Sequence, residues 1–153
     1  MGAGLWVSMQ AQPYRESNQR PARGGKHPVV LIADDDRINL MVAKKMLLKI
    51  LPDAEILEAP DGENAIALYR RYQPELILMD LQMPNTDGYT ATQVILEHAY
   101  TTGRTPAIIA LTAGSIEGER ERCLASGMSD FLSKPLAQAN LREVVETVLK
   151  PAQ

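Results

Sequence analysis

The sequence contains a single cysteine, one tryptophan and one phenylalanine among its 153 residues, and aromatic residues make up only 5% of the chain. One cysteine excludes an intrachain disulfide framework and any metal site built from several thiolates, and it suits a reducing compartment. No apolar run approaches the length of a membrane span, and residues 4–7 are too short for the apolar core of a signal peptide. These absences predict a soluble, cytoplasmic protein.

The chain also has fewer basic than acidic residues, with 16 Lys and Arg against 19 Asp and Glu, which gives a net charge of −3. Residues 1–27 carry a net charge of +3, so the remaining residues carry −6. An acidic domain attracts cations and basic partner surfaces and repels a phosphate backbone, so we expect no nucleic-acid partner. Residues 1–27 lack apolar periodicity and are interpreted as a flexible linker or leader, in which Leu5, Trp6 and Val7 are the candidates to pack on the domain.

The rest of the chain has enough apolar residues for one core. The whole chain is 45% hydrophobic and 23% charged, ordinary values for a globular domain, and 153 residues allow one domain with a modest tail. We therefore expect one folded domain over residues 28–150 and a short tail over residues 151–153.

Short apolar runs alternate with amphipathic segments throughout this domain. The runs have the composition of strands buried on both faces and span residues 29–33, 56–59, 76–79, 107–111 and 131–133. The segments between them have the apolar spacing of helices. This alternation predicts an α/β fold with a parallel sheet covered on both faces. Right-handed crossovers then bring the carboxyl ends of all strands to one edge of the sheet.

Polar side chains follow four of these strands. Asp34 and Asp35 come after the first strand, Asp80 after the third, Thr112 after the fourth and Lys134 after the fifth. Binding sites of open α/β sheets lie at this edge. Clustered carboxylates repel one another unless a cation lies among them, and oxygen ligands without His or Cys favour a hard cation such as Mg²⁺. A lysine and a hydroxyl suit a phosphoryl group, so the pattern indicates phosphoryl transfer to or from a carboxylate.

Four segments resemble the signatures of response-regulator receiver domains. They are residues 30–39 (VLIADDDRIN), 78–88 (LMDLQMPNTDG), 110–113 (ALTA) and 131–135 (FLSKP). The resemblance covers residues 28–150, and residues 118–130 are most similar to receivers fused to hybrid histidine kinases. It implies a flavodoxin-like (βα)5 three-layer sandwich whose five parallel strands lie in the order 2-1-3-4-5. It also implies an aspartyl-phosphate phosphorelay.

The resemblance assigns a role to each residue at the strand ends. Asp80 takes a phosphoryl group from a phosphohistidine of a histidine kinase or of a histidine-containing phosphotransfer protein. Mg²⁺ is ligated by Asp35 directly and by Asp34 largely through water, together with Asp80 and the backbone carbonyl of Gln82. Lys134 pairs with Asp80 at rest and with the phosphoryl group afterwards.

The resemblance also implies a switch. Thr112 swings its hydroxyl to the phosphoryl group, and Phe131 turns inward into the space that Thr112 leaves. The bond between Lys134 and Pro135 is expected to be cis, a form that is rare outside X-Pro bonds. A weak homodimer through the fourth and fifth helices is a further expectation from the family.

Three positions depart from the more frequent family pattern. Asp36 stands where many relatives carry Asn, and we interpret it as a solvated helix start. Phe131 replaces the more frequent Tyr, so its inward turn is steric and forms no hydroxyl hydrogen bond. Gly114 places no side chain over the site, which leaves Gln82 as the residue that modulates access of water to an aspartyl-phosphate.

Two other classes of function compete with a phosphoacceptor. A phosphatase or other hydrolase that uses an aspartyl-phosphate needs a dedicated acid or base and usually a cap, for which the chain has no room. A receiver fold that binds partners without phosphorylation is the second alternative. As an isolated domain the chain is expected to be no enzyme beyond its own phosphotransfer and dephosphorylation. With no output domain after residue 150 and no kinase motif before residue 28, we expect the excised end of a hybrid kinase or a stand-alone receiver.

Several chemically capable residues have a purely structural interpretation. Cys123 lies among apolar residues of a helix and is expected to be buried and unreactive. Met41 is expected to pack in the core or a loop. Arg120 and Arg122 lie among glutamates and predict a solvated helix face, with a surface for exchanging partners as a second interpretation.

Overall fold

A computed structural model describes residues 27–114 and 117–149. The expected contact of Leu5, Trp6 and Val7 with the domain therefore lies outside the described residues. Within the described ranges, no helix has both the length and the apolar character needed to cross a membrane.

Strands and helices alternate along the chain. The strands are β1 (Val29–Ala33), β2 (Glu55–Ala59), β3 (Leu76–Asp80), β4 (Ala107–Thr112) and β5 (Asp130–Ser133). The helices are α2 (Arg37–Ile50), α3 (Gly62–Tyr72), α4 (Gly88–Thr102), α5 (Glu117–Ala125) and α6 (Gln138–Val148). All five expected strands are present, and each starts and ends within one residue of its predicted bounds, because polar residues and turns flank each apolar run.

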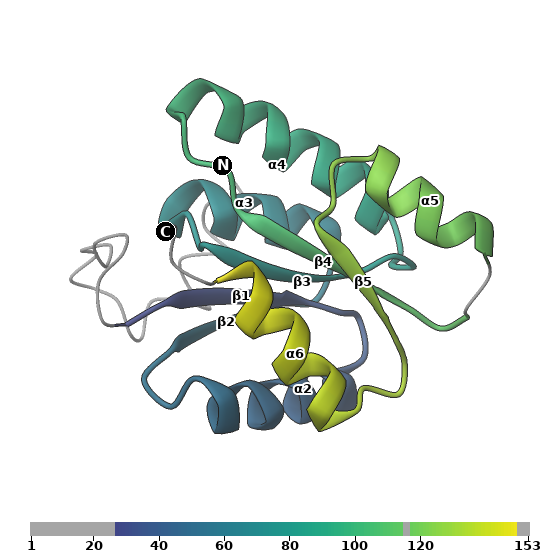
Figure 1. The fold of residues 1–153 in the computed structure, drawn as a ribbon. Coiled ribbons are helices and arrows are strands. Elements are labelled where there is room, and N and C mark those ends of the chain that lie inside the picture. Colours follow the sequence, from purple (N-terminus) through teal and green to yellow (C-terminus); the bar gives the residue numbers. More distant parts are fainter. Residues whose placement is uncertain (1–26, 115–116, 150–153) are drawn as a thin grey trace.

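The sheet is parallel throughout, in the order β2-β1-β3-β4-β5. Helices α3, α4 and α5 cover one face, and α2 and α6 cover the other (Figure 1). The predicted three-layer (βα)5 sandwich is confirmed. Since β1 lies between β2 and β3, the strand order reverses beside β1, which is where α/β sheets place their ligands.

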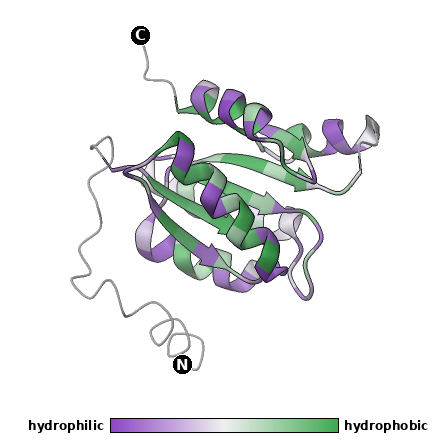
Figure 2. Ribbon diagram, turned by 90° about the horizontal axis from the view of Figure 1, so that it is seen from below, coloured by the Kyte–Doolittle hydropathy of each residue, from purple (hydrophilic) through white to green (hydrophobic). Residues whose placement is uncertain are grey.

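The core has two halves, one on each face of the sheet. Successive strand residues point to opposite faces, so Leu31 and Ile77 pack toward α3 and α4, while Ile32 and Leu78 pack toward α2 and α6. In Figure 2 the strands are mostly hydrophobic along their whole length, whereas each helix alternates between polar and apolar residues. The central strands are therefore buried on both sides, which makes the sheet a rigid support for residues at its edge.

Two single-residue expectations have different outcomes in α2. Asp36 is exposed and caps the helix, because its Oδ1 accepts hydrogen bonds from the backbone amides of Ile38 at 2.8 Å and Asn39 at 3.4 Å. The interpretation as a solvated helix start is confirmed. The expectation that Met41 packs in the core is wrong, since Met41 is 55% exposed while Leu40 and Leu47 are buried. The helical period sends positions 40 and 47 inward and position 41 outward.

Gly88 packs tightly against the end of β3. Its amide donates a hydrogen bond to the carbonyl of Leu81 at 3.1 Å, and a Cβ at this position would lie 2.3 Å from the carbonyl oxygen of Asp80. The first turn of α4 thus approaches the backbone of Asp80 more closely than any residue with a side chain would allow.

We predict that Gly88→Ala lowers the free energy of unfolding by about 1–3 kcal/mol, because backbone atoms have to move to admit the methyl group. Gly118→Ala is the matched control, since a Cβ on Gly118 meets nothing within 4 Å. Its stability is expected to stay equal or to rise by up to ~1 kcal/mol from helix propensity. Urea unfolding of the two variants checks this, and equal stabilities would contradict the close approach.

Candidate functional site

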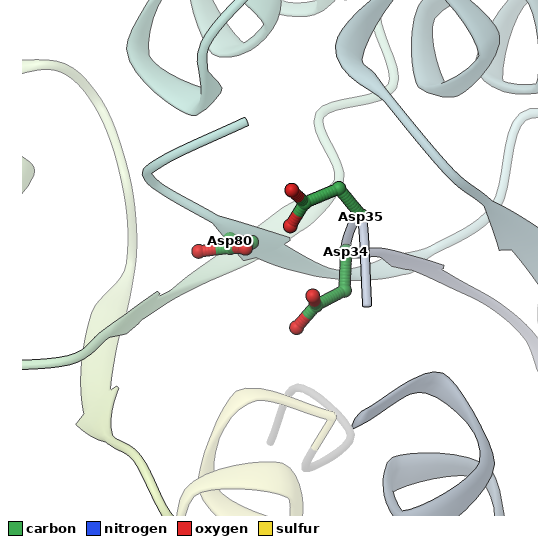
Figure 3. A group of neighbouring side chains, drawn as sticks. All are labelled: Asp34, Asp35 and Asp80. Atoms are coloured by element: carbon green, nitrogen blue, oxygen red, sulfur yellow. The ribbon is translucent and has the colours of Figure 1, made fainter. Parts of the chain in front are cut away.

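Three carboxylates meet at the carboxyl ends of two neighbouring strands. Asp34 and Asp35 follow β1, Asp80 ends β3, and one oxygen of each lies within 4.8 Å of the others (Figure 3). Asp34 is only 1% exposed and Asp80 4%, whereas Asp35 is open to solvent. The parallel pairing of β1 with β3 therefore brings together side chains that are 46 positions apart in the sequence.

Lys134 supplies the positive charge of this cluster. Its Nζ lies 3.0 Å from Oδ2 of Asp34 and 3.3 Å from Oδ2 of Asp80. It follows β5, two strands away from β3, and its long side chain spans the distance across the sheet edge. The peptide bond between Lys134 and Pro135 is cis. The pairing differs from the expected one with Asp80 alone, because the lysine is shared and its shorter contact is to Asp34.

Backbone and amide donors hold the two buried carboxylates in place. Oδ1 of Asp34 accepts from the backbone amide of Asp36 at 2.9 Å and from Nδ2 of Asn39 at 3.5 Å. Oδ1 of Asp80 accepts from the backbone amide of Gln82 at 3.2 Å. Asn39 was missed as a site residue, although its place in the first turn of α2, directly after the acidic run, is a signal that points to it.

The site keeps an excess of negative charge. Burial, followed by the charge of Asp34, raises the pKa of Asp80 from 3.8 to about 6, although the Gln82 amide and Lys134 oppose this shift. Burial alone would lower the pKa of Lys134, but the hydrogen bond to Asp34 and the charge of Asp80 outweigh it and raise that pKa. Lys134 is therefore a firmly held cation facing more than one carboxylate.

The donor set and its surroundings fit a hard divalent cation. All side-chain donors of the cluster are carboxylate oxygens, the ligands that Mg²⁺ prefers, and one of them is exposed. An open cavity of about 670 Å³ adjoins them, lined among others by Asp35, Asp80, Gln82 and Lys134. There is room for a hydrated ion and for an incoming phosphoryl group. The exposed Gln82 side chain borders this space.

The two expected switch residues lie beside the site. Thr112 ends β4 next to Asp80 and is buried, and its hydroxyl contacts Gly114, donating to the carbonyl at 3.3 Å and accepting from the amide at 3.2 Å. In this arrangement the hydroxyl forms its hydrogen bonds with the backbone of the loop that follows β4. Phe131 on β5 is half-buried, and the guanidinium carbon of Arg120 lies 5.8 Å from its ring centroid.

The interpretation of Arg120 and Arg122 as a merely solvated helix face is incomplete. Both residues are exposed, yet each guanidinium lies over an aromatic ring, Arg120 over Phe131 and Arg122 over Tyr89 at 4.0 Å. A guanidinium stacks on a ring face while its edge stays hydrated, which the charge pattern of one helix does not reveal. The expectation that Cys123 is buried is confirmed, since none of its surface is exposed.

The fold and the acidic cluster define a class of protein, the doubly wound α/β domains with an acidic site beyond the strand ends. Residues 30–146 match the family described as the response regulator receiver domain, and the chain belongs to that family.

Its relatives include hybrid histidine kinases. The chain is 40% identical over 116 residues to the hybrid signal transduction histidine kinase G of Dictyostelium discoideum, covering 76% of this chain and 3% of that protein. It is 34% identical over 128 residues to the sensor protein GacS of Pseudomonas syringae pv. syringae, covering 82% of this chain and 14% of that protein. The chain thus spans only a small part of the curated relatives it matches.

Solved structures of similar sequence are receiver domains too. One is the receiver domain of sensor histidine kinase PA1611 from Pseudomonas aeruginosa PAO1, solved with a magnesium ion coordinated in its active site cleft. It is 34% identical with a TM-score of 0.71, and the match covers 82% of this chain and 99% of that chain. The receiver domain of Saccharomyces cerevisiae Ssk1, in complex with the histidine phosphotransfer protein Ypd1, is 27% identical with a TM-score of 0.71, over 78% of this chain and 87% of that chain.

The electrostatics of Asp80 predict a gain in stability when its charge is removed. Because its pKa in the folded protein lies above 3.8, at about 6, folding favours the protonated carboxyl. The stabilisation that the protonated carboxyl gives to the folded protein is fully present below pH 3.8 and is lost as the pH rises through about 6. We expect Asp80→Asn to raise the free energy of unfolding by about 1–3 kcal/mol at neutral pH without Mg²⁺.

Urea unfolding at pH 5 and at pH 7.5 checks this expectation, and the gain should be smaller at the lower pH. Asp53→Asn removes an exposed carboxylate and serves as the control, with a change within about 0.5 kcal/mol. A variant that is no more stable than the wild type at pH 7.5 would show that the carboxylate cluster is not under electrostatic strain.

Proposed function

We propose that this chain is a phosphoacceptor receiver domain in which Asp80 accepts a phosphoryl group from a phosphohistidine of a histidine kinase or a phosphotransfer protein. The observation that carries the proposal is the position of Asp80, a buried carboxylate on the wall of an open cavity, 3.3 Å from the ammonium group of Lys134. Hybrid histidine kinases are among its relatives, so a hybrid kinase of the cytoplasm is the parent protein we propose.

The chemistry is a displacement at phosphorus. An Oδ atom of Asp80 attacks, the O–P bond forms as the N–P bond to the partner's imidazole breaks, and the electron pair stays on the imidazole nitrogen. Bound Mg²⁺, held by Asp34, Asp35, Asp80 and the backbone carbonyl of Gln82, would supply positive charge to the phosphoryl oxygens. Lys134 neutralises the charge that the new acyl phosphate brings to the pocket.

The same pocket supports a switch. Phosphorylation adds roughly two negative charges and new acceptor oxygens at Asp80. The Thr112 hydroxyl then breaks its hydrogen bonds with Gly114 and donates to a phosphoryl oxygen. Phe131 turns into the space that Thr112 leaves. The output is a shift of population between two arrangements of the β4–α5 and β5 region, read by a partner. Catalysis by the isolated domain is limited to its own phosphorylation and dephosphorylation.

The partner's docking surface is proposed to include the outer face of α2. Ile38 is 66% exposed there, next to the equally outward Met41 and Val42, and Ile38 also lines the cavity at Asp80. An exposed apolar patch of this kind marks a protein interface. Lys44 and Lys45 follow on the same exposed side of the helix and suit an acidic partner. A receiver bound to a histidine phosphotransfer protein is found among the similar structures, which supports a partner of that class.

Phosphorylation itself is the first test. Incubation with a small phosphodonor and Mg²⁺, followed by intact mass, is expected to add one phosphoryl group to the wild type and to Asp53→Asn, and none to Asp80→Asn. Loss of the gain in EDTA would show that the divalent ion is needed. If the folded wild type gains nothing while another receiver domain does so in parallel, the domain is a phosphorylation-independent interaction module instead.

Gln82 is proposed to limit the access of water to the aspartyl-phosphate. Its exposed side chain borders the cavity, and Gly114 has no side chain with which to cover the site. Gln82→Ala is therefore expected to speed dephosphorylation by about two- to tenfold, a loss of roughly 0.4–1.4 kcal/mol of barrier. Decay of the phosphorylated species, followed by mass, measures it, with the exposed Asn140→Ala on α6 as control. An unchanged decay rate would contradict this role.

A further inference from the structure

Tyr89 joins the first turn of α4 to α5 through three contacts. Its hydroxyl donates a hydrogen bond to Oε2 of Glu119 and lies 3.7 Å from Sγ of Cys123. The guanidinium carbon of Arg122 lies 4.0 Å from the centroid of its ring. We call these four residues the Tyr89 cluster. Three of its members lie on α5 and one lies on α4, so the cluster bridges two helices.

The cluster is well built for holding these helices together. Tyr89 and Glu119 are half-buried and Cys123 is fully buried, so water competes only weakly for their hydrogen bonds. Burial, and then the hydrogen bond to Glu119, raise the pKa of Tyr89. The hydroxyl therefore stays protonated and donates to a charged acceptor, which makes this one of the stronger kinds of hydrogen bond.

Helix α5 has few other means of attachment. Among its described side chains, those of residues 118–125, only Cys123 is buried. The C-terminal end has a separate tie to α4, because Nε2 of Gln93 donates to the carbonyl of Ser126 at 3.1 Å. The Tyr89 cluster, with the contact of Arg120 with Phe131, thus holds the first half of α5. An element with so little buried apolar surface opens more easily than the core.

The two sides of the cluster lead to two parts of the site, the backbone of Asp80 and the hydroxyl of Thr112. On the α4 side, Tyr89 follows Gly88, which packs against the backbone carbonyl of Asp80. On the α5 side, the chain runs back from Glu117 to Gly114, whose backbone holds the Thr112 hydroxyl. A cavity of about 470 Å³ lies between the start of α4 and α5, with Gln82, Tyr89, Glu119 and Arg122 among its lining residues.

We infer that Tyr89 and Glu119 are positioning residues that hold α5 in its resting place and thereby keep the Thr112 hydroxyl on Gly114. This inference rests on the proposed function of Asp80 as phosphoacceptor. For Thr112 to reach a phosphoryl group, its contacts with Gly114 break and Gly114, three positions before the start of α5, shifts. A fixed α5 opposes that shift, so the cluster raises the free energy of the active arrangement.

Hydrogen exchange of the unphosphorylated protein tests the structural half. Tyr89→Phe keeps the ring under Arg122 and removes only the hydroxyl. We expect the amides of the first half of α5 to exchange about tenfold faster, as the loss of a hydrogen bond to a charged group implies. Tyr100→Phe is the matched control, because Tyr100 is 88% exposed on the same helix as Tyr89. Equal exchange in Tyr89→Phe and the wild type would overturn the inference.

The rate of phosphorylation tests the coupling. With a small phosphodonor at saturating Mg²⁺, Tyr89→Phe and Glu119→Ala are expected to be phosphorylated about three- to tenfold faster than the wild type, because the active arrangement costs less. Glu121→Ala, an exposed glutamate of the same helix, is the control and should match the wild type. The double variant should equal the single ones, since each removes the same hydrogen bond.

The outcomes separate this inference from the proposed function. Faster exchange with unchanged phosphorylation would overturn the coupling and leave Tyr89 a structural residue. Additive effects in the double variant would overturn the single bridge between Tyr89 and Glu119. If the wild type accepts no phosphoryl group at all, the proposed function fails and the coupling with it, while the exchange experiment still decides whether the cluster holds α5.

Discussion

The repulsion among Asp34, Asp35 and Asp80 is the interaction on which the rest of the structure depends. Three carboxylates within 4.8 Å of one another, two of them buried, are stable only with a positive charge beside them. Among the described residues, one ammonium group, that of Lys134, pairs with the cluster and is shared between Asp34 and Asp80, so negative charge remains in excess. The site therefore attracts a cation and raises the pKa of Asp80. The repulsion among these carboxylates lowers the stability of the folded protein, a cost that is common at functional sites.

The surroundings of this cluster differ sharply in rigidity. Strands β1 and β3 are buried along their whole length and hold the carboxylates in fixed positions. Helix α5, in contrast, buries one described side chain and depends on polar and cation–π contacts to Tyr89 and Phe131. A rigid carboxylate beside a weakly anchored helix is what the proposed two-state switch requires, because a phosphoryl group on Asp80 would then move the helix without disturbing the sheet.

Much of this arrangement could be predicted from local patterns. The apolar runs located the strands, and the residue that follows each run located the candidate site, because parallel strands share one edge. Asp36 was recognisable as a helix start because capping depends on residues only a few positions apart. The face of α2 on which Met41 lies was misjudged, since a methionine suits the core as well as an exposed interface, and only the packing of Leu40 and Leu47 decides which side is inward.

The sequence by itself determined the fold class, the strand ends and the set of residues gathered there, because hydrophobic periodicity and chain connectivity act over short distances. Only the tertiary structure decided how those residues pair. Lys134 lies nearer to Asp34 than to Asp80, Thr112 turns to Gly114, and Tyr89 reaches Glu119 across 30 positions. Such pairings depend on distances of a few tenths of an ångström to a few ångströms between side chains of different elements. These distances are set by packing of the whole domain and by no pattern along the chain.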